Sequence, residues 1–118
     1  MVNGHSGATS WYAKGFPTGG NSGTDRLSEH YNKHGKDMGF SSKSEYNNAA
    51  VGFMNKTPTA NIDYFVDRRG TIYKFDHDTS EFGIADVNGN MVTYFVPSGD
   101  AEAYWYKQVD KYDDEHQL

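Results

Sequence analysis

The chain has 118 residues, the length of a single domain, with a net charge of −5, no cysteine and 15% aromatic residues. The lack of cysteine excludes a disulfide framework and thiolate metal sites. The acidic balance argues against tight, sequence-independent binding to nucleic acid, because phosphate contacts need clustered lysine and arginine. No apolar run is long enough to form a membrane segment.

The first 24 residues differ from the rest of the chain in composition. They hold six of the 13 glycines, together with serine, threonine and one proline, and they show neither helical nor alternating periodicity. Such a stretch is typical of a linker or a loosely docked arm. We therefore expect a Gly/Ser-rich arm over 1–24 and one folded domain over 25–118.

Two helices are predicted next. The first runs to His34, with Thr24 or Asp25 as its N-cap and Gly35 as a left-handed stop. Its inward face contains Leu27, His30, Tyr31 and His34. The second helix starts with a capping-box pattern and ends near Lys56. The capping pair is Ser42 and Glu45, and the apolar residues at helical spacing are Tyr46, Ala49, Ala50, Phe53 and Met54.

From residue 62 the apolar pattern alternates with a period of two, which is typical of strands. It covers IDYFVD (62–67), TIYKFD (71–76), EFGIAD (81–86) and MVTYFV (91–96). The joining segments are short, and Asn88-Gly89 is a strong hairpin signal, so the strands should form an antiparallel meander. An amphipathic stretch over 101–112 predicts a last helix. The predicted fold class is α+β, with two N-terminal helices packed on a four-stranded antiparallel meander sheet and a short C-terminal helix.

His30 and His34 are the first candidates for chemistry, because they lie four residues apart on one helix face. Such a pair can bind one zinc ion, but no glutamate follows the first histidine as in zinc proteases and no third ligand stands at an expected offset. Packing of both rings in the domain is the simpler alternative. Acid–base catalysis is the third, since histidine exchanges protons near neutral pH.

RNA cleavage is the reaction that such a pair suits best. A base removes the 2′-hydroxyl proton, an acid protonates the leaving 5′-oxygen, and a cation or hydroxyl stabilises the phosphorane, without a metal. Candidate stabilisers are Lys36, Arg68, Arg69 and Lys74, with Thr93 as a hydrogen-bond donor. Each also has a structural alternative: a strand threonine, a lysine extending from an outer face, or solvated turn arginines.

Strand 91–96 should present two faces. Alternation places Met91, Thr93 and Phe95 on one side, and Val92, Tyr94 and Val96 on the other. We expect one of these faces to be open.

Three segments resemble the carboxy-terminal toxin domains of bacterial polymorphic toxins, including effectors of contact-dependent growth inhibition. They are LSEHYNKHGKDMGF, SSKSEYNNAAVGFMN and YFVDRRGTIYKFDHDTSEFGIADVNGNMVTYFVP, within residues 26–97. Such domains are similar to members of the barnase/EndoU/colicin/RelE superfamily of metal-independent ribonucleases. Several members are tRNases, and some cut in the anticodon loop.

The resemblance implies roles for individual residues. His30, with His34 beside it, would be the acid–base group, and Thr93 the polar donor on the sheet. Lys74, or one of Arg68 and Arg69, would be the cation. Around these catalytic candidates we expect Lys36, Arg68, Arg69 and Tyr94 to bind the substrate. No cofactor and no metal are implied.

The resemblance also implies a biological setting. The domain would be the end of a larger secreted or cell-surface polypeptide that is delivered into a competing bacterium. It would act on tRNA in the target-cell cytoplasm and would be neutralised by a cognate immunity protein, with a host activating factor as a further candidate partner. Two alternatives are a non-catalytic protein-binding domain of a secreted or phage-associated protein and a metal-dependent DNase.

Overall fold

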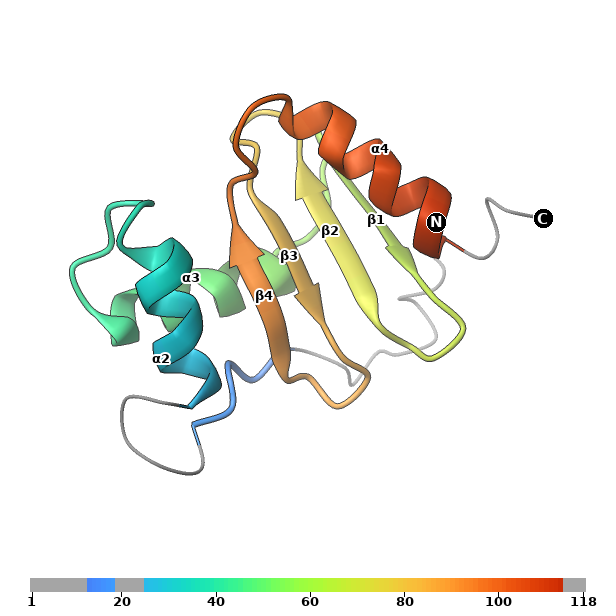
Figure 1. The fold of residues 1–118 in the computed structure, drawn as a ribbon. Coiled ribbons are helices and arrows are strands. Elements are labelled where there is room, and N and C mark those ends of the chain that lie inside the picture. Colours follow the sequence, from blue (N-terminus) through green and yellow to red (C-terminus); the bar gives the residue numbers. More distant parts are fainter. Residues whose placement is uncertain (1–12, 19–24, 114–118) are drawn as a thin grey trace.

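The computed structural model describes residues 13–18 and 25–113 of the chain. Its fold is α+β, as predicted, with a four-stranded antiparallel sheet in the order β1-β2-β3-β4 (Figure 1). The strands are β1 (Ile62–Val66), β2 (Ile72–Asp76), β3 (Phe82–Ala85) and β4 (Met91–Phe95). The helical elements are α2 (Arg26–His30), the π-helical turn η1 (Tyr31–Gly35), α3 (Lys43–Asn55) and α4 (Ala101–Tyr112). Every predicted strand and helix is therefore present.

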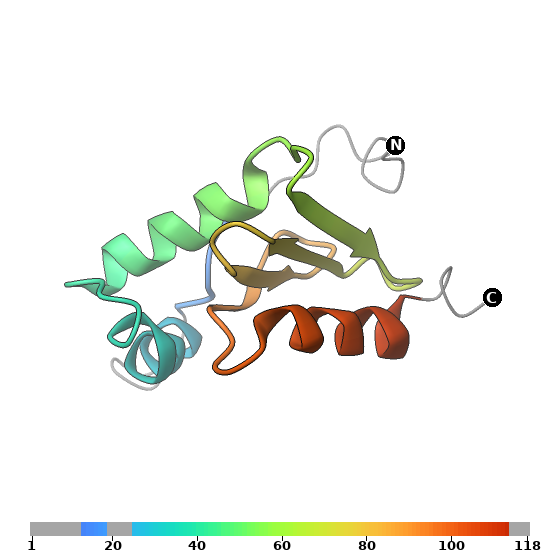
Figure 2. The same cartoon turned by 90° about the horizontal axis from the view of Figure 1, so that it is seen from above.

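The elements form three layers. Helix α3 covers one face of the sheet and α4 the other, while α2 lies beside the edge strand β4 (Figures 1 and 2). Each helix that packs on the sheet has a side-chain N-cap: Ser42 accepts from the Glu45 amide, and Asp100 from the Ala103 amide. The short helix α2 and the turn η1 that follows it carry the two candidate histidines, His30 and His34.

The core under α3 is built from aromatic and aliphatic side chains. Its buried members are Ala13, Phe16, Tyr31, Tyr46, Ala50, Phe53, Met54, Ile72, Ala85, Met91 and Tyr94. Glycine at position 83 of β3 allows α3 to lie close to the sheet, because a Cβ there would stand 2.7 Å from the Met54 sulfur. The close approach therefore depends on the missing side chain.

A second core lies under α4. Its buried members are Phe65, Tyr73, Phe75, Phe82, Ala101 and Trp105, and the Trp105 and Phe75 rings stack with centroids 5.6 Å apart. His77 joins α4 to the sheet, with Nδ1 2.5 Å from a Glu102 oxygen and Nε2 2.7 Å from an Asp63 oxygen. Burial opposes protonation of His77, but the hydrogen bonds to these carboxylates outweigh it and raise its pKa.

Strand β4 does not alternate as simply as predicted. Thr93 pairs with Ile84, whereas Met91 pairs with Ala85, so β4 contains one extra residue at this point. The bulge places Met91 in the core under α3 together with Tyr94. Thr93 shares its face with Ile84, which packs against the core under α4. The prediction that Met91 and Thr93 face the same way is therefore wrong.

The predicted role of Gly35 also needs correction. Asp25 is the N-cap of α2, as expected, and accepts from the Ser28 amide. Gly35, however, is not in the left-handed region, and the positive φ occurs at Gly39, at 94°. A Cβ on Gly35 would lie 2.5 Å from the Tyr31 ring and 2.9 Å from the Tyr46 ring. Glycine is therefore needed at this position for close ring packing.

The predicted arm is partly folded. In the described segment 13–18, Ala13 and Phe16 are buried, and the Phe16 amide donates to Asn47 Oδ1 at 2.9 Å. Gly15 forms a parallel bridge with Asn90 at the start of β4. The domain therefore begins upstream of residue 25; the remaining positions of the predicted arm lie outside the described residues.

Within the described ranges, the structure contains no helix that combines the length and apolar character needed to span a bilayer.

Candidate functional site

Helix α2 and the turn η1 bring two histidines to the edge of the sheet. η1 includes an i to i+5 hydrogen bond from the Lys36 amide to the Tyr31 carbonyl. The His30 and His34 ring centroids are 5.8 Å apart, and both side chains are half-buried. His30 Nδ1 lies 3.5 Å from Thr93 Oγ1. Three residues predicted as catalytic therefore meet at β4.

Stacking orients both imidazoles. The His34 ring stacks on Phe95 with centroids 4.6 Å apart, and the His30 ring stacks on Phe16 at 5.1 Å. Phe16 belongs to the core under α3, whereas Phe95 packs against the core under α4. The histidines thus lie beside β4, between the two cores, and each ring stacks on a phenylalanine.

The electrostatic surroundings keep both histidines neutral at neutral pH. Burial, followed by the positive charges of His34, Arg26 and Lys33, lowers the pKa of His30 to about 4. Burial also lowers the pKa of His34, with Lys33 acting in the same direction and Asp37 opposing it. Neutral imidazoles can accept protons, and an anion bound between the rings would favour their charged forms.

A groove of about 560 Å³ opens beside His34, at the end of β4. Its lining residues are His34, Asp37, Met38, Phe40, Glu81, Tyr94, Phe95, Val96, Pro97 and Ser98. The Tyr94 hydroxyl donates to the Glu81 carboxylate, which also accepts from the Thr79 hydroxyl. Sequence reasoning did not identify Glu81 or Asp37, because neither shares a spacing motif with the histidines.

Tyr94 belongs to this groove but is largely committed to the fold. Its side chain is 2% exposed, and its carbonyl accepts a 2.5 Å hydrogen bond from the Tyr46 hydroxyl. Burial, followed by the contact with Glu81, raises the pKa of the Tyr94 phenol, which stays protonated. Lys36, also predicted to bind substrate, is exposed on the turn after η1, with Nζ 5.8 Å from the centre of the Tyr31 ring.

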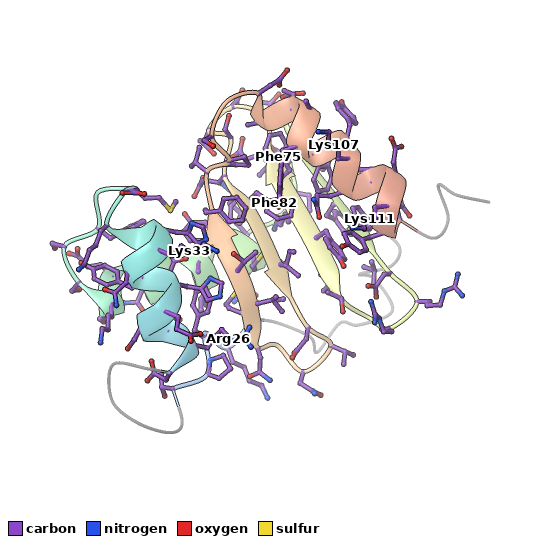
Figure 3. All side chains as sticks on the ribbon, viewed as in Figure 1. Arg26, Lys33, Phe75, Phe82, Lys107 and Lys111 are labelled. Carbon is purple, nitrogen blue, oxygen red and sulfur yellow. The ribbon has the colours of Figure 1, made fainter. Side chains whose placement is uncertain are left out.

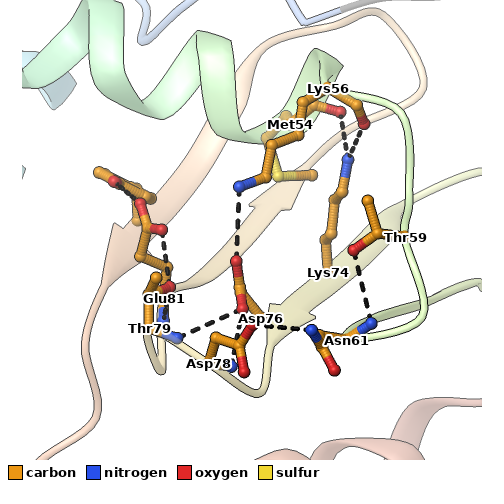
Figure 4. A network of polar contacts seen from close by, with 10 residues as sticks. Met54, Lys56, Thr59, Asn61, Lys74, Asp76, Asp78, Thr79 and Glu81 are labelled. Carbon is orange, nitrogen blue, oxygen red and sulfur yellow. Dashed lines mark hydrogen bonds and ion pairs between the residues drawn. The ribbon is translucent and has the colours of Figure 1, made fainter.

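Lys74 lies on the opposite face of the sheet from Thr93 and is not brought to the histidines. It is 1% exposed, and its ammonium donates to the carbonyls of Met54 at 3.2 Å and Lys56 at 2.6 Å (Figure 4). These carbonyls are at the C-terminal end of α3, where a cation is favourable. Burial, followed by the charge of Lys56, lowers the pKa of Lys74 to about 8. The ammonium therefore satisfies carbonyls at the end of α3, while burial opposes its charged form.

Arg68 and Arg69 lie in the turn between β1 and β2, on the side of the sheet away from β4. They line a cavity of about 320 Å³ together with Asp67, Lys111 and Tyr112. Arg69 Nη2 is 3.8 Å from an Asp67 oxygen. Neither arginine contributes to the histidine site itself.

The described part of the chain contains no group of three or more His, Asp or Glu side chains arranged to hold a metal ion. His5 and His116 lie outside the described residues.

Comparison with known proteins found no matching protein-family model, and no curated protein matches the sequence. The fold and the geometry at β4 are therefore the observations on which a function is argued.

Proposed function

We propose that this protein is a metal-independent endoribonuclease that cleaves tRNA by attack of the 2′-hydroxyl. The observation that carries the proposal is the meeting of His30, His34 and Thr93 at the edge strand β4, with 3.5 Å between His30 Nδ1 and Thr93 Oγ1. Two half-buried imidazoles beside a hydroxyl provide the proton acceptor, proton donor and hydrogen-bond donor that this reaction needs.

The pKa values of the two rings suggest their roles. His30 has its pKa lowered to about 4, so it is present as the free base. It takes the proton of the 2′-hydroxyl, and the 2′-oxygen then attacks the adjacent phosphorus. The bound phosphate favours the charged form of His34. The bond from phosphorus to the 5′-oxygen breaks, and the His34 imidazolium gives its proton to that oxygen. The products are a 2′,3′-cyclic phosphate and a free 5′-hydroxyl.

Nearby cations support the same centre. The positive charges of Arg26 and Lys33 act on His30, since both lower its pKa. The same charges attract a phosphodiester and stabilise negative charge on its oxygens in the transition state. They take the place that sequence reasoning gave to Lys74, whose ammonium is buried on the other face.

The biological part of the proposal rests on the resemblance to polymorphic toxin domains. The chain would be the end of a larger secreted or surface-displayed polypeptide, delivered into a competing bacterium and active in its cytoplasm. A cognate immunity protein would bind it, and a host factor would be a possible activator.

The test is cleavage of purified bacterial tRNA by the purified chain in EDTA. We expect discrete fragments with cyclic phosphate ends, and a loss of at least about 100-fold in rate for His30→Ala and for His34→Ala. The matched control is His77→Ala, which removes a histidine that follows β2 and contacts Asp63 of β1 and Glu102 of α4, away from β4. Intact RNA at high protein excess would contradict the proposal and favour a protein-binding domain. Activity that disappears in EDTA, with cleavage of plasmid, would favour a metal-dependent DNase.

A further inference from the structure

The sheet surface between the histidine helix and α4 carries partly exposed aromatic and polar side chains. Ile84, Thr93, Phe95 and Tyr104 are all half-buried. Phe95 and Tyr104 meet edge-on, with ring centroids 5.7 Å apart. We call the surface formed by these four residues and the two histidine rings the β4 platform. The platform lies next to the reaction centre, and its aromatic rings are partly exposed.

One side of α4 faces this platform and is positively charged. Tyr104, Lys107 and Lys111 follow each other at i, i+3 and i+7, so they share one side of the helix. Tyr104 defines the direction of that side, because its ring packs against Phe82 and Phe95 of β3 and β4. Both lysines are exposed.

The opposite side of α4 has a different partner. Glu102 binds His77 through a 2.5 Å contact, and Tyr106 lies at 6.4 Å from the same imidazole, measured between ring centroids. The Glu102 carboxylate is therefore directed toward β1, away from the platform. Helix α4 lies outside the segment that resembles toxin domains, which ends near residue 97.

Cations also border the platform on its other side. Arg26 and Lys33 are exposed, and both act on the His30 imidazole. In Figure 3, Arg26 and Lys33 lie at the β4 edge and Lys107 and Lys111 on α4, with Phe82 between them. Four lysine and arginine side chains therefore border the platform, although the whole chain carries −5 and the groove beside His34 contains Asp37 and Glu81.

From this arrangement we infer that the β4 platform binds an unpaired RNA strand that enters the histidine site, with phosphates held by the cations on both sides. This inference deepens the proposed function, on which it rests for the identity of the reaction centre. Single strands bind proteins through a basic path combined with aromatic rings on which the bases stack. A duplex offers no free base faces to the rings, so the preferred target is a loop or another unpaired segment.

The cationic path continues beyond the platform. Lys111 also lines the 320 Å³ cavity that contains Arg68, Arg69 and Tyr112. The turn arginines, which were predicted to bind substrate, would thus contact the RNA at a distance from the cleaved bond.

The experiment measures binding separately from cleavage. Fluorescence anisotropy follows the His30→Ala chain with a fluorescein-labelled, unstructured RNA of about 12 nucleotides, in EDTA and over a range of salt concentrations. The double variant Lys107→Gln/Lys111→Gln is compared in the same background. We expect about tenfold weaker binding at low salt and a salt slope smaller by about 1.4, since each single-strand phosphate contact contributes about 0.7.

The matched control changes the net charge equally on the other side of the molecule. Ser44→Glu/Asn48→Glu adds two negative charges at exposed positions of α3. This changes the net charge of the chain by as much as the loss of two lysines from α4. Less than about a twofold change is expected for this control, because salt screens distant charges.

Three outcomes would overturn the inference. The first is an unchanged affinity and salt slope in the lysine variant, and the second is an equal loss of affinity in the control. The third is equally tight binding of the same RNA after it has been annealed to its complementary strand. Lysine-dependent binding of the single strand by a chain that leaves tRNA intact in the cleavage assay would uphold the inference and reject the ribonuclease. Cleavage by the wild-type chain with lysine-independent binding would do the reverse.

Discussion

Three glycine-to-alanine substitutions separate the steric role of Gly35 from the conformational role that its sequence position suggests. Gly35 lies where a Cβ would be 2.5 Å from the Tyr31 ring and 2.9 Å from the Tyr46 ring. Gly39 has a φ of 94° and open space around its Cβ position. Gly52, in α3, has neither constraint. The series therefore tests crowding, backbone strain and helix propensity one at a time.

The three substitutions should change the unfolding free energy in different directions. Overpacking costs about 1 to 3 kcal/mol, and the better helix propensity of alanine returns about 1, so Gly35→Ala should lose up to about 2 kcal/mol of unfolding free energy. Gly39→Ala should lose about 1 to 2 kcal/mol, because an L-residue is strained in the left-handed region. Gly52→Ala should gain about 0.5 to 1 kcal/mol.

Urea unfolding followed by far-ultraviolet circular dichroism measures all three changes. The sharper assay repeats Gly35→Ala in a Tyr31→Leu background, where the nearest ring is absent. The cost of the alanine should then fall by about 1 kcal/mol, which appears as coupling in the double-mutant cycle. A Gly35→Ala chain as stable as Gly52→Ala, or a cost that is the same in both backgrounds, would refute the steric reasoning.

Two further predictions concern pH. The pKa of Lys74 is lowered from 10.5 to about 8, so the folded chain binds fewer protons than the unfolded chain between these values. Its unfolding free energy relative to Lys74→Met should therefore rise by about 3 kcal/mol across this range, as measured by urea unfolding at each pH; parallel curves would contradict it. The raised pKa of His77 gives the opposite pH dependence of stability. The stability advantage over His77→Gln should be complete below pH 6.5 and disappear as the pH rises through the folded pKa. A stability advantage that grows with pH would contradict the proposed role of the charged His77 in joining α4 to the sheet through Glu102 and Asp63.

The secondary structure could be predicted closely because its signals are local. The capping pattern at Ser42 and the hairpin at Asn88-Gly89 depend on residues a few positions apart. The predicted end of the second helix near Lys56 agrees with α3, whose last residue is Asn55. Alternation of apolar residues was likewise sufficient to place four strands and their antiparallel order.

The candidate site could be predicted only in part. The shared helix face of His30 and His34 was visible in the spacing, and the structure places Thr93 beside them. Lys74 could not be assigned from sequence, because its burial depends on how α3 ends against β2. Glu81 lines the groove beside His34 through a contact between segments that no short pattern connects.

The amino-acid sequence by itself determined where helices and strands form, since periodicity, caps and turns act over a few neighbouring residues. Only the tertiary structure decided which side chains meet. The bulge in β4 moved Met91 to the α3 face while Thr93 faced the histidines, and ring packing made Gly35 a steric requirement. It also showed Ala13 and Phe16 as part of the core. These outcomes depend on contacts between distant segments, whose energies no local pattern contains.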